Sequence, residues 1–253
     1  DMEELKIAKK MKPKTAFVLG LGSALGLFFV VGFFILLVMV MGDDNNVKAV
    51  NNDIVSPSPS AAAAQPNSGK VALNPVDKKT DWIKGDPKAK ISIVEFSDTE
   101  CPYCKRFHET MNQIVDEYSG QVNWVYRHFP LISLHSKATK EAEATECAGE
   151  QKGNTGFWSY LDRLFAITPS NNQLAEGQLT EIAQYVGLDV NDFEECLASG
   201  KYTAKVQSQA SQAQAAGGTG TPYSVIVNGE TLAPLSGALP LEQLKTIIDS
   251  LLQ

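Results

Sequence analysis

Residues 15–42 form the longest uncharged stretch of the sequence and limit how the whole chain can fold. They number 28, from Thr15 to Gly42, and contain the apolar runs 28–31 and 33–38. About 20 helical residues cross a bilayer core of about 30 Å, whereas the apolar core of a cleaved signal peptide usually has about 7–15 residues. No small-x-small cleavage site follows Gly42, so we predict a single transmembrane helix that acts as an uncleaved signal-anchor.

The charges on either side of this segment predict its orientation. Five lysines precede it within residues 1–14, and Asp43 and Asp44 follow it. The positive-inside rule therefore places residues 1–14 in the cytoplasm and the rest outside the cytoplasmic membrane, on its periplasmic or extracellular face. Disulfides persist in such a space. The net charge of -7 provides no basic face for phosphates, so we expect no nucleic-acid partner.

The composition changes twice after the predicted span. Residues 43–80 are rich in Asn, Ser, Pro and Ala and have too few large apolar residues to bury a core, which predicts a flexible, disordered linker. Residues 81–253 regain the apolar content of a compact domain and are numerous enough to form a good core.

The pattern within residues 81–253 predicts an α/β domain with a helical insertion. A β-branched run at 90–96, a helical apolar period from Phe107 to Tyr118 and alternation at 122–126 make a βαβ unit. Residues from about 136 to 216 indicate several helices. Strand signals return at 223–227 and 231–235 around Asn228-Gly229, a hairpin dipeptide, and an amphipathic helix follows at 241–251.

The motif Cys101-Pro102-Tyr103-Cys104 lies where the first of these helices begins. Proline is favoured at the first helical position, which makes Cys101 the N-cap and sets its sulfur beside unpaired N–H groups that favour a thiolate. Cys104 falls on the apolar stripe and is suited to resolving a mixed disulfide. The alternatives are an inert bridge or half of a zinc site, but the other cysteines form no second close pair, so we expect redox chemistry and no metal or cofactor.

Cys147 and Cys196 stand 49 residues apart in predicted helices. In an exported protein two such thiols favour a structural disulfide, with two buried free thiols as the alternative. The three histidines have no metal-ligand spacing, and we expect His108 at the surface, about two helical turns from Cys101.

Several motifs together resemble the DsbA-type thiol–disulfide oxidoreductases. The resemblance covers residues 81–253 and rests on Val94-Glu95-Phe96, the CxxC motif, residues 126–131, Glu146-Cys147-Ala148 with Phe157-Trp158, and residues 218–222. It implies a thioredoxin fold with an inserted helical domain. It also implies that Thr221-Pro222 is a cis-proline loop that binds substrate, and that Glu95 is a buried acid that relays protons to the resolving cysteine. Glu95 pointing to solvent at a strand end is the alternative.

Tyr103 departs from the resemblance, because the best-known DsbA proteins have histidine there and CPYC is usual in glutaredoxins. Pro102 and Tyr103 tune the reduction potential, so this departure bears on the direction of electron flow. We expect an oxidase that acts on exported protein thiols and is reset by a membrane or soluble redox partner. An isomerase or reductase that uses the same site is the first alternative, and a chaperone-like binding module is the second.

Overall fold

The structure, a computed structural model, describes residues 71–175 and 177–253. The predicted signal-anchor at 15–42 and residues 43–70 of the predicted linker lie outside the described residues. Within the described ranges, none of the helices combines the length and the apolar character needed to cross a membrane.

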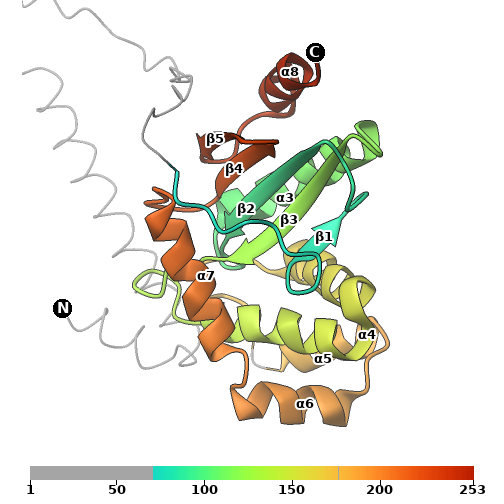
Figure 1. The fold of residues 1–253 in the computed structure, drawn as a ribbon. Coiled ribbons are helices and arrows are strands. Elements are labelled where there is room, and N and C mark those ends of the chain that lie inside the picture. Colours follow the sequence, from blue (N-terminus) through green and yellow to red (C-terminus); the bar gives the residue numbers. More distant parts are fainter. Residues whose placement is uncertain (1–70, 176) are drawn as a thin grey trace, which may run out of the picture. The chain divides into compact units, whose positions relative to one another are not determined.

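A five-stranded sheet forms the centre of the domain, with the strand order β1-β3-β2-β4-β5 (Figure 1). β2 and β3 are parallel, and the other neighbouring strands are antiparallel. β1 was not predicted, and the hairpin turn consists of Gly229 and Glu230, one residue later than Asn228-Gly229. The strands are β1 (Trp82–Lys84), β2 (Ile91–Ser97), β3 (Val122–His128), β4 (Tyr223–Asn228) and β5 (Thr231–Ser236).

Helices cover both faces of this sheet. Alternate side chains of a strand point to opposite faces, so Ile91, Ile93 and Glu95 of β2 face the side covered by α3 (Pro102–Glu117) and α8 (Leu241–Leu252). Val94 and Phe96 face the other side, where the C-terminal end of α7 (Thr203–Ala215) packs. Glu95 therefore lies on the central strand and on the same side as the helix that begins with the CxxC motif.

The helical region between β3 and β4 has a core of its own. This core is built by α4 (Ala138–Ile167), which breaks helical geometry at Lys152 and Gly153, together with α5 (Gln178–Tyr185) and α6 (Val190–Ser199). These helices bury Tyr160 and Phe193 against each other. The predicted α/β fold with a helical insertion is confirmed.

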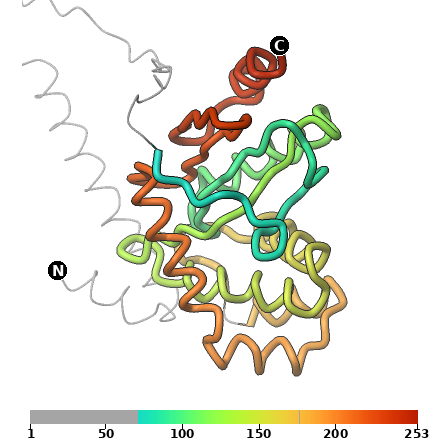
Figure 2. The backbone as a smooth tube through the Cα atoms, in the orientation of Figure 1, coloured from blue at the N-terminus to red at the C-terminus, as the bar shows by residue number. Residues whose placement is uncertain are grey.

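The folded domain begins before the predicted boundary at residue 81. Val71, Leu73 and Val76 are partly buried against the core on the α7 side of the sheet. The Arg127 guanidinium donates to the carbonyls of Asn74 and Pro75, at 3.0 and 3.2 Å, and holds this segment beside α7 (Figure 2). Residues 71–80 were wrongly placed in the flexible linker. Their few apolar side chains pack against a core that includes the end of α7, more than a hundred residues later in the sequence, and no local pattern reveals this contact.

Candidate functional site

Cys101 begins α3 in the position that the sequence predicted. It is the N-cap, with extended backbone angles of φ -80 and ψ 121, and Pro102 follows at the first helical position. Its sulfur lies 3.5 Å from the carbonyl oxygen of Thr221. The Cys104 thiol hydrogen-bonds to this sulfur and, with the main-chain N–H groups at the helix start, lowers the Cys101 pKa from 9.0 to about 6, although burial opposes the shift. Cys101 is therefore a thiolate at neutral pH and can act as the nucleophile or leaving group.

Cys104 is completely buried one helical turn further along α3. The Asp98 main-chain N–H donates to its sulfur at 3.4 Å. Burial raises the Cys104 pKa well above 9.0, and its hydrogen bond to Cys101 and the charges of Cys101 and Glu95 add to this effect. The two free cysteines therefore differ, because Cys101 ionises readily while Cys104 keeps its proton.

The Thr221-Pro222 peptide bond is cis and faces Cys101 from the loop before β4. Thr221 is half-buried and Pro222 is buried, and the Pro222 carbonyl accepts the Gly237 N–H at 2.9 Å. The tertiary fold thus brings together a proline loop and a cysteine that are 120 residues apart. Its cis geometry was implied only by the resemblance.

Glu95 is buried near the two cysteines with 1 % of its surface exposed, not at the solvent-facing strand end that was the alternative. Neither carboxyl oxygen has a hydrogen-bond partner in the part of the chain that the structure describes. Burial raises the pKa of Glu95 from 4.5 to about 8, and the charge of Cys101 adds to the rise. The carboxyl group is therefore protonated at neutral pH and can exchange a proton within the working pH range.

The residues between the cysteines lie at the surface. Pro102 is exposed, and Tyr103 has 56 % of its surface exposed. The Arg106 guanidinium lies 5.3 Å from the centre of the Tyr103 ring. The dipeptide itself brings no cation to the thiolate, so any positive charge there must come from another part of the fold.

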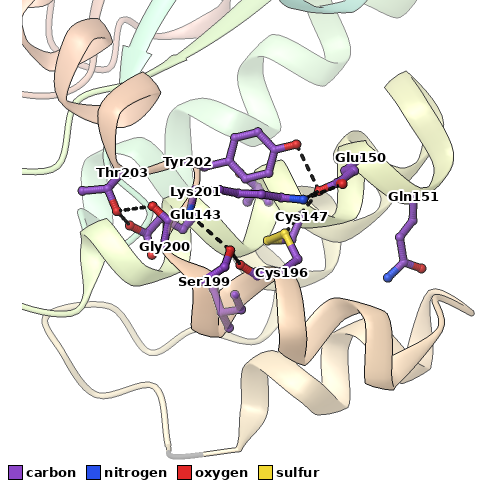
Figure 3. Close-up of a disulfide and its surroundings, with 12 residues drawn as sticks. Glu143, Cys147, Glu150, Gln151, Cys196, Ser199, Gly200, Lys201, Tyr202 and Thr203 are labelled. Carbon is purple, nitrogen blue, oxygen red and sulfur yellow. Dashed lines mark hydrogen bonds and ion pairs between the residues drawn. A yellow bond between two sulfur atoms is a disulfide. The ribbon is translucent and has the colours of Figure 1, made fainter.

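Cys147 and Cys196 are joined by a disulfide between α4 and α6 (Figure 3). Their Cα atoms are 5.9 Å apart, and both residues belong to the core of the helical region. Next to the bridge, Glu150 accepts hydrogen bonds from Lys201 and Tyr202. Closing a loop of 49 residues stabilises a fold by roughly 3–4 kcal/mol in the chain-entropy model, so the bridge serves as a clamp on the helical region.

His108 was predicted at the surface, and the structure corrects this. It is buried, with its Nε2 atom 2.7 Å from Asp162 Oδ1 and its ring against Trp124 and Phe165. The prediction was wrong because α4 covers a second side of α3 beside its apolar stripe. Burial lowers the His108 pKa, although Asp162 opposes the shift.

The sequence reasoning also missed a buried polar group directly before Cys101. Asp98 and Glu100 precede the cysteine, and the structure places them beside His135 and Glu141, all at 6 % exposure or less. Acidic residues directly before a CxxC helix were a visible signal. The partner of Asp98, however, is His135, which follows 37 positions later in the sequence. No group of three or more His, Cys, Asp or Glu residues among 71–175 and 177–253 is arranged to hold a metal ion.

Comparison with known proteins places this site in context. A family model described as thioredoxin matches residues 77–250. The crystal structure of DsbA2 from Pseudomonas aeruginosa shares 32% sequence identity, with a TM-score of 0.59 over 67% of this chain and 93% of that chain. BdbD from Bacillus subtilis shares 19% identity and supports the fold alone, with a TM-score of 0.61 over 73% of this chain and 99% of that chain.

Curated relatives contain a similar segment inside much longer chains. The Na(+)/H(+) antiporter NhaA 3 of Salinispora tropica is 33% identical over 155 residues, which cover 61% of this chain and 22% of that protein. NhaA 1 of Mycolicibacterium gilvum is 30% identical over 164 residues, which cover 64% of this chain and 25% of that protein. The chain thus spans about a quarter or less of the length of these relatives.

Proposed function

The chain belongs to the thioredoxin family and is a DsbA-like thiol–disulfide oxidoreductase, and from this we propose that it oxidises the thiols of exported proteins. The observation that carries the direction is the set of donors around the Cys101 sulfur, namely the Cys104 thiol and the N–H groups at the start of α3. These donors stabilise the thiolate, which exists only in the reduced site. Stabilising the reduced form makes a CxxC disulfide a stronger oxidant.

The proposed reaction has two exchange steps. A substrate thiolate attacks Cys101 Sγ of the Cys101–Cys104 disulfide, the S–S bond breaks, and its electron pair passes to Cys104, which takes a proton from Glu95. A second substrate thiolate then attacks the substrate sulfur of the mixed disulfide, and Cys101 leaves as a thiolate. The substrate gains a disulfide, and the enzyme ends with a Cys101 thiolate and a Cys104 thiol. Glu95 takes back a proton from solvent, and a redox partner must accept the two electrons.

An exposed apolar surface supports extended polypeptides as substrates. Of the four large apolar side chains exposed in the described residues, Tyr103 lies between the cysteines, and Ile132 and Leu134 lie in the loop of residues 129–137. This loop is attached to Asp98, through the Leu131 N–H at 2.7 Å and through His135 at 2.9 Å. Unfolded chains expose apolar side chains that could cover this surface.

Replacing Ile132 and Leu134 together with serine is expected to lower kcat/KM for a dithiol peptide with apolar flanks about 30-fold. The two side chains would each lose roughly 1 kcal/mol of apolar contact with the peptide. Oxidation of dithiothreitol should keep its wild-type rate, because this small dithiol does not reach the loop. Tyr185→Ser, which removes another exposed large side chain from the helical region, is the matched control. Equal loss with both substrates would refute a substrate surface here.

The reduction potential decides between the oxidase and the reductase alternative. Equilibration of the full chain with glutathione buffers should give a value above roughly -200 mV, well above the value of about -270 mV typical of thioredoxin. Thiolate stabilisation at Cys101 is the physical reason. A value near that of thioredoxin or below it would contradict the oxidase and favour a reductase.

We propose in addition that residues 15–42 anchor the enzyme in the cytoplasmic membrane, with the catalytic domain outside. The length of the uncharged segment and the lysines that precede it support this orientation. In intact spheroplasts, a membrane-impermeant maleimide should label Cys101 of the reduced protein, and the protein should stay with the membranes after a carbonate wash. Labelling only after lysis would contradict the orientation, and release by the wash would contradict the anchor.

A further inference from the structure

The Asp98 carboxylate occupies a completely buried position directly before the CxxC helix. One of its oxygens accepts the Glu100 N–H at 2.8 Å. The other accepts the Leu131 N–H at 2.7 Å and lies 2.9 Å from His135 Nδ1. Three donors from two loops thus hold this carboxylate in one place.

The main chain of the same residue touches both cysteines. The Asp98 N–H donates to Cys104 Sγ at 3.4 Å, and the Asp98 carbonyl accepts the Cys101 N–H at 3.1 Å. Whatever fixes the Asp98 side chain therefore also fixes the backbone that supports the two sulfurs.

A buried negative charge at this position works against a thiolate at Cys101, because like charges in a dry environment repel strongly. The other ionisable side chains that face Asp98 are Glu100 on the same loop, Glu141 on α4 and Tyr126 on β3, and none of them can carry a positive charge. Among the residues that the structure describes, His135 is the one side chain of basic type within ion-pair distance of the Asp98 carboxylate. Pro102 and Tyr103 carry no charge.

We propose that His135 is a positioning residue for thiol–disulfide exchange: its imidazolium balances the Asp98 carboxylate and so preserves the Cys101 thiolate, a task that the Pro-Tyr dipeptide cannot perform. The proposal rests on exchange at Cys101 and not on the direction of electron flow. His135 lies in the same loop as Ile132 and Leu134, so this loop would contribute both substrate contact and charge to the site.

The electrostatics of His135 agree with this role. Its side chain is only 8% exposed, and burial disfavours its charged form. The hydrogen bond and charge of Asp98 and the charge of Cys101 nevertheless hold the His135 pKa above its usual value of 6.5. The attraction between Cys101 and His135 is mutual, so the imidazolium also favours the thiolate.

The test compares two substitutions that disrupt the same ion pair with opposite changes of charge. His135→Asn keeps a donor near the position of Nδ1 but loses the positive charge, and Asp98→Asn loses the negative one. In the reduced full chain, the pH profile of Cys101 alkylation by iodoacetamide, read by mass spectrometry, reports the thiolate fraction. His135→Asn should lower that fraction at pH 5 about tenfold, Asp98→Asn should raise it, and the double variant should lie near the wild type.

Two further variants keep the test decisive. His108→Gln changes a second buried histidine that packs on α3 and should leave the Cys101 profile unchanged. If Asp98→Asn does not fold, His135→Lys replaces it, and retention of the wild-type profile would support the charge role. Shifts in the same direction for His135→Asn and Asp98→Asn, or no shift for His135→Asn, would overturn the proposal while leaving exchange activity at Cys101 itself intact.

Discussion

Replacing Cys101 with alanine is expected to reduce oxidation of a dithiol peptide to the uncatalysed background, a loss of at least roughly 1000-fold. The thiolate at the start of α3 is the only sulfur of the pair that ionises near neutral pH, since the Cys101 pKa is about 6 and that of Cys104 lies well above 9.0. The rate of peptide oxidation, followed by mass spectrometry, measures the loss.

Cys104→Ala is the matched control, because it removes the other sulfur of the same motif. It should also stop peptide oxidation, but its Cys101 can still attack a disulfide substrate, and without a resolving thiol the mixed disulfide should accumulate on a non-reducing gel. Oxidation that persists in Cys101→Ala would refute the assignment of the nucleophile. If Cys101→Ala binds unfolded chains as well as the wild type and keeps them from aggregating, the chaperone-like alternative would be favoured instead.

Replacing Glu95 with glutamine is expected to slow exchange about 100-fold at the steps that move the proton of Cys104. Glutamine has nearly the same shape but cannot release a proton. The wild-type rate should show an inflection near pH 8, the pKa to which burial raises Glu95, and the variant should lack it. Glu109→Gln removes an exposed carboxylate from α3 and should leave both rate and profile unchanged. An unchanged rate in Glu95→Gln would rule out the proton relay.

The same substitution should change how stability depends on pH. The folded-state pKa of Glu95 is raised from 4.5 to about 8, so the unfolded chain loses this proton first and the free energy of unfolding falls as pH rises between these values. The loss amounts to about 4–5 kcal/mol by pH 9. Glu95→Gln should therefore gain stability relative to the wild type between pH 5 and pH 9.

Urea unfolding of the oxidised protein at the two pH values measures this gain. The reduced protein is unsuitable, because the lowered pKa of Cys101 makes it more stable as pH rises above about 6 and so opposes the Glu95 effect. Burial is the largest cause of the Glu95 shift and remains in the oxidised protein. A variant with the same pH dependence as the wild type would show that Glu95 is not buried as described.

The features that depend on neighbouring residues could be predicted from the amino-acid pattern alone. Proline after Cys101 specifies a helix start, the apolar period specifies which face of α3 is buried, a β-branched run specifies β2, and strand alternation specifies β3. These signals are strong because each rests on backbone geometry over a few residues. They sufficed to predict the nucleophile and the resolving cysteine, and the general order of the elements from β2 onward.

The distant segments that meet around those sulfurs became known only from the folded domain. Thr221 lies 120 residues after Cys101, His135 lies 37 after Asp98, and residues 71–80 bind an arginine on β3. The burial of His108 likewise depends on α4 covering a second side of α3. Such contacts depend on how the chain returns to the sheet, which no local pattern encodes. The environment that lowers the Cys101 pKa and raises the Glu95 pKa therefore belongs to the fold, even though both residues could be proposed from the sequence.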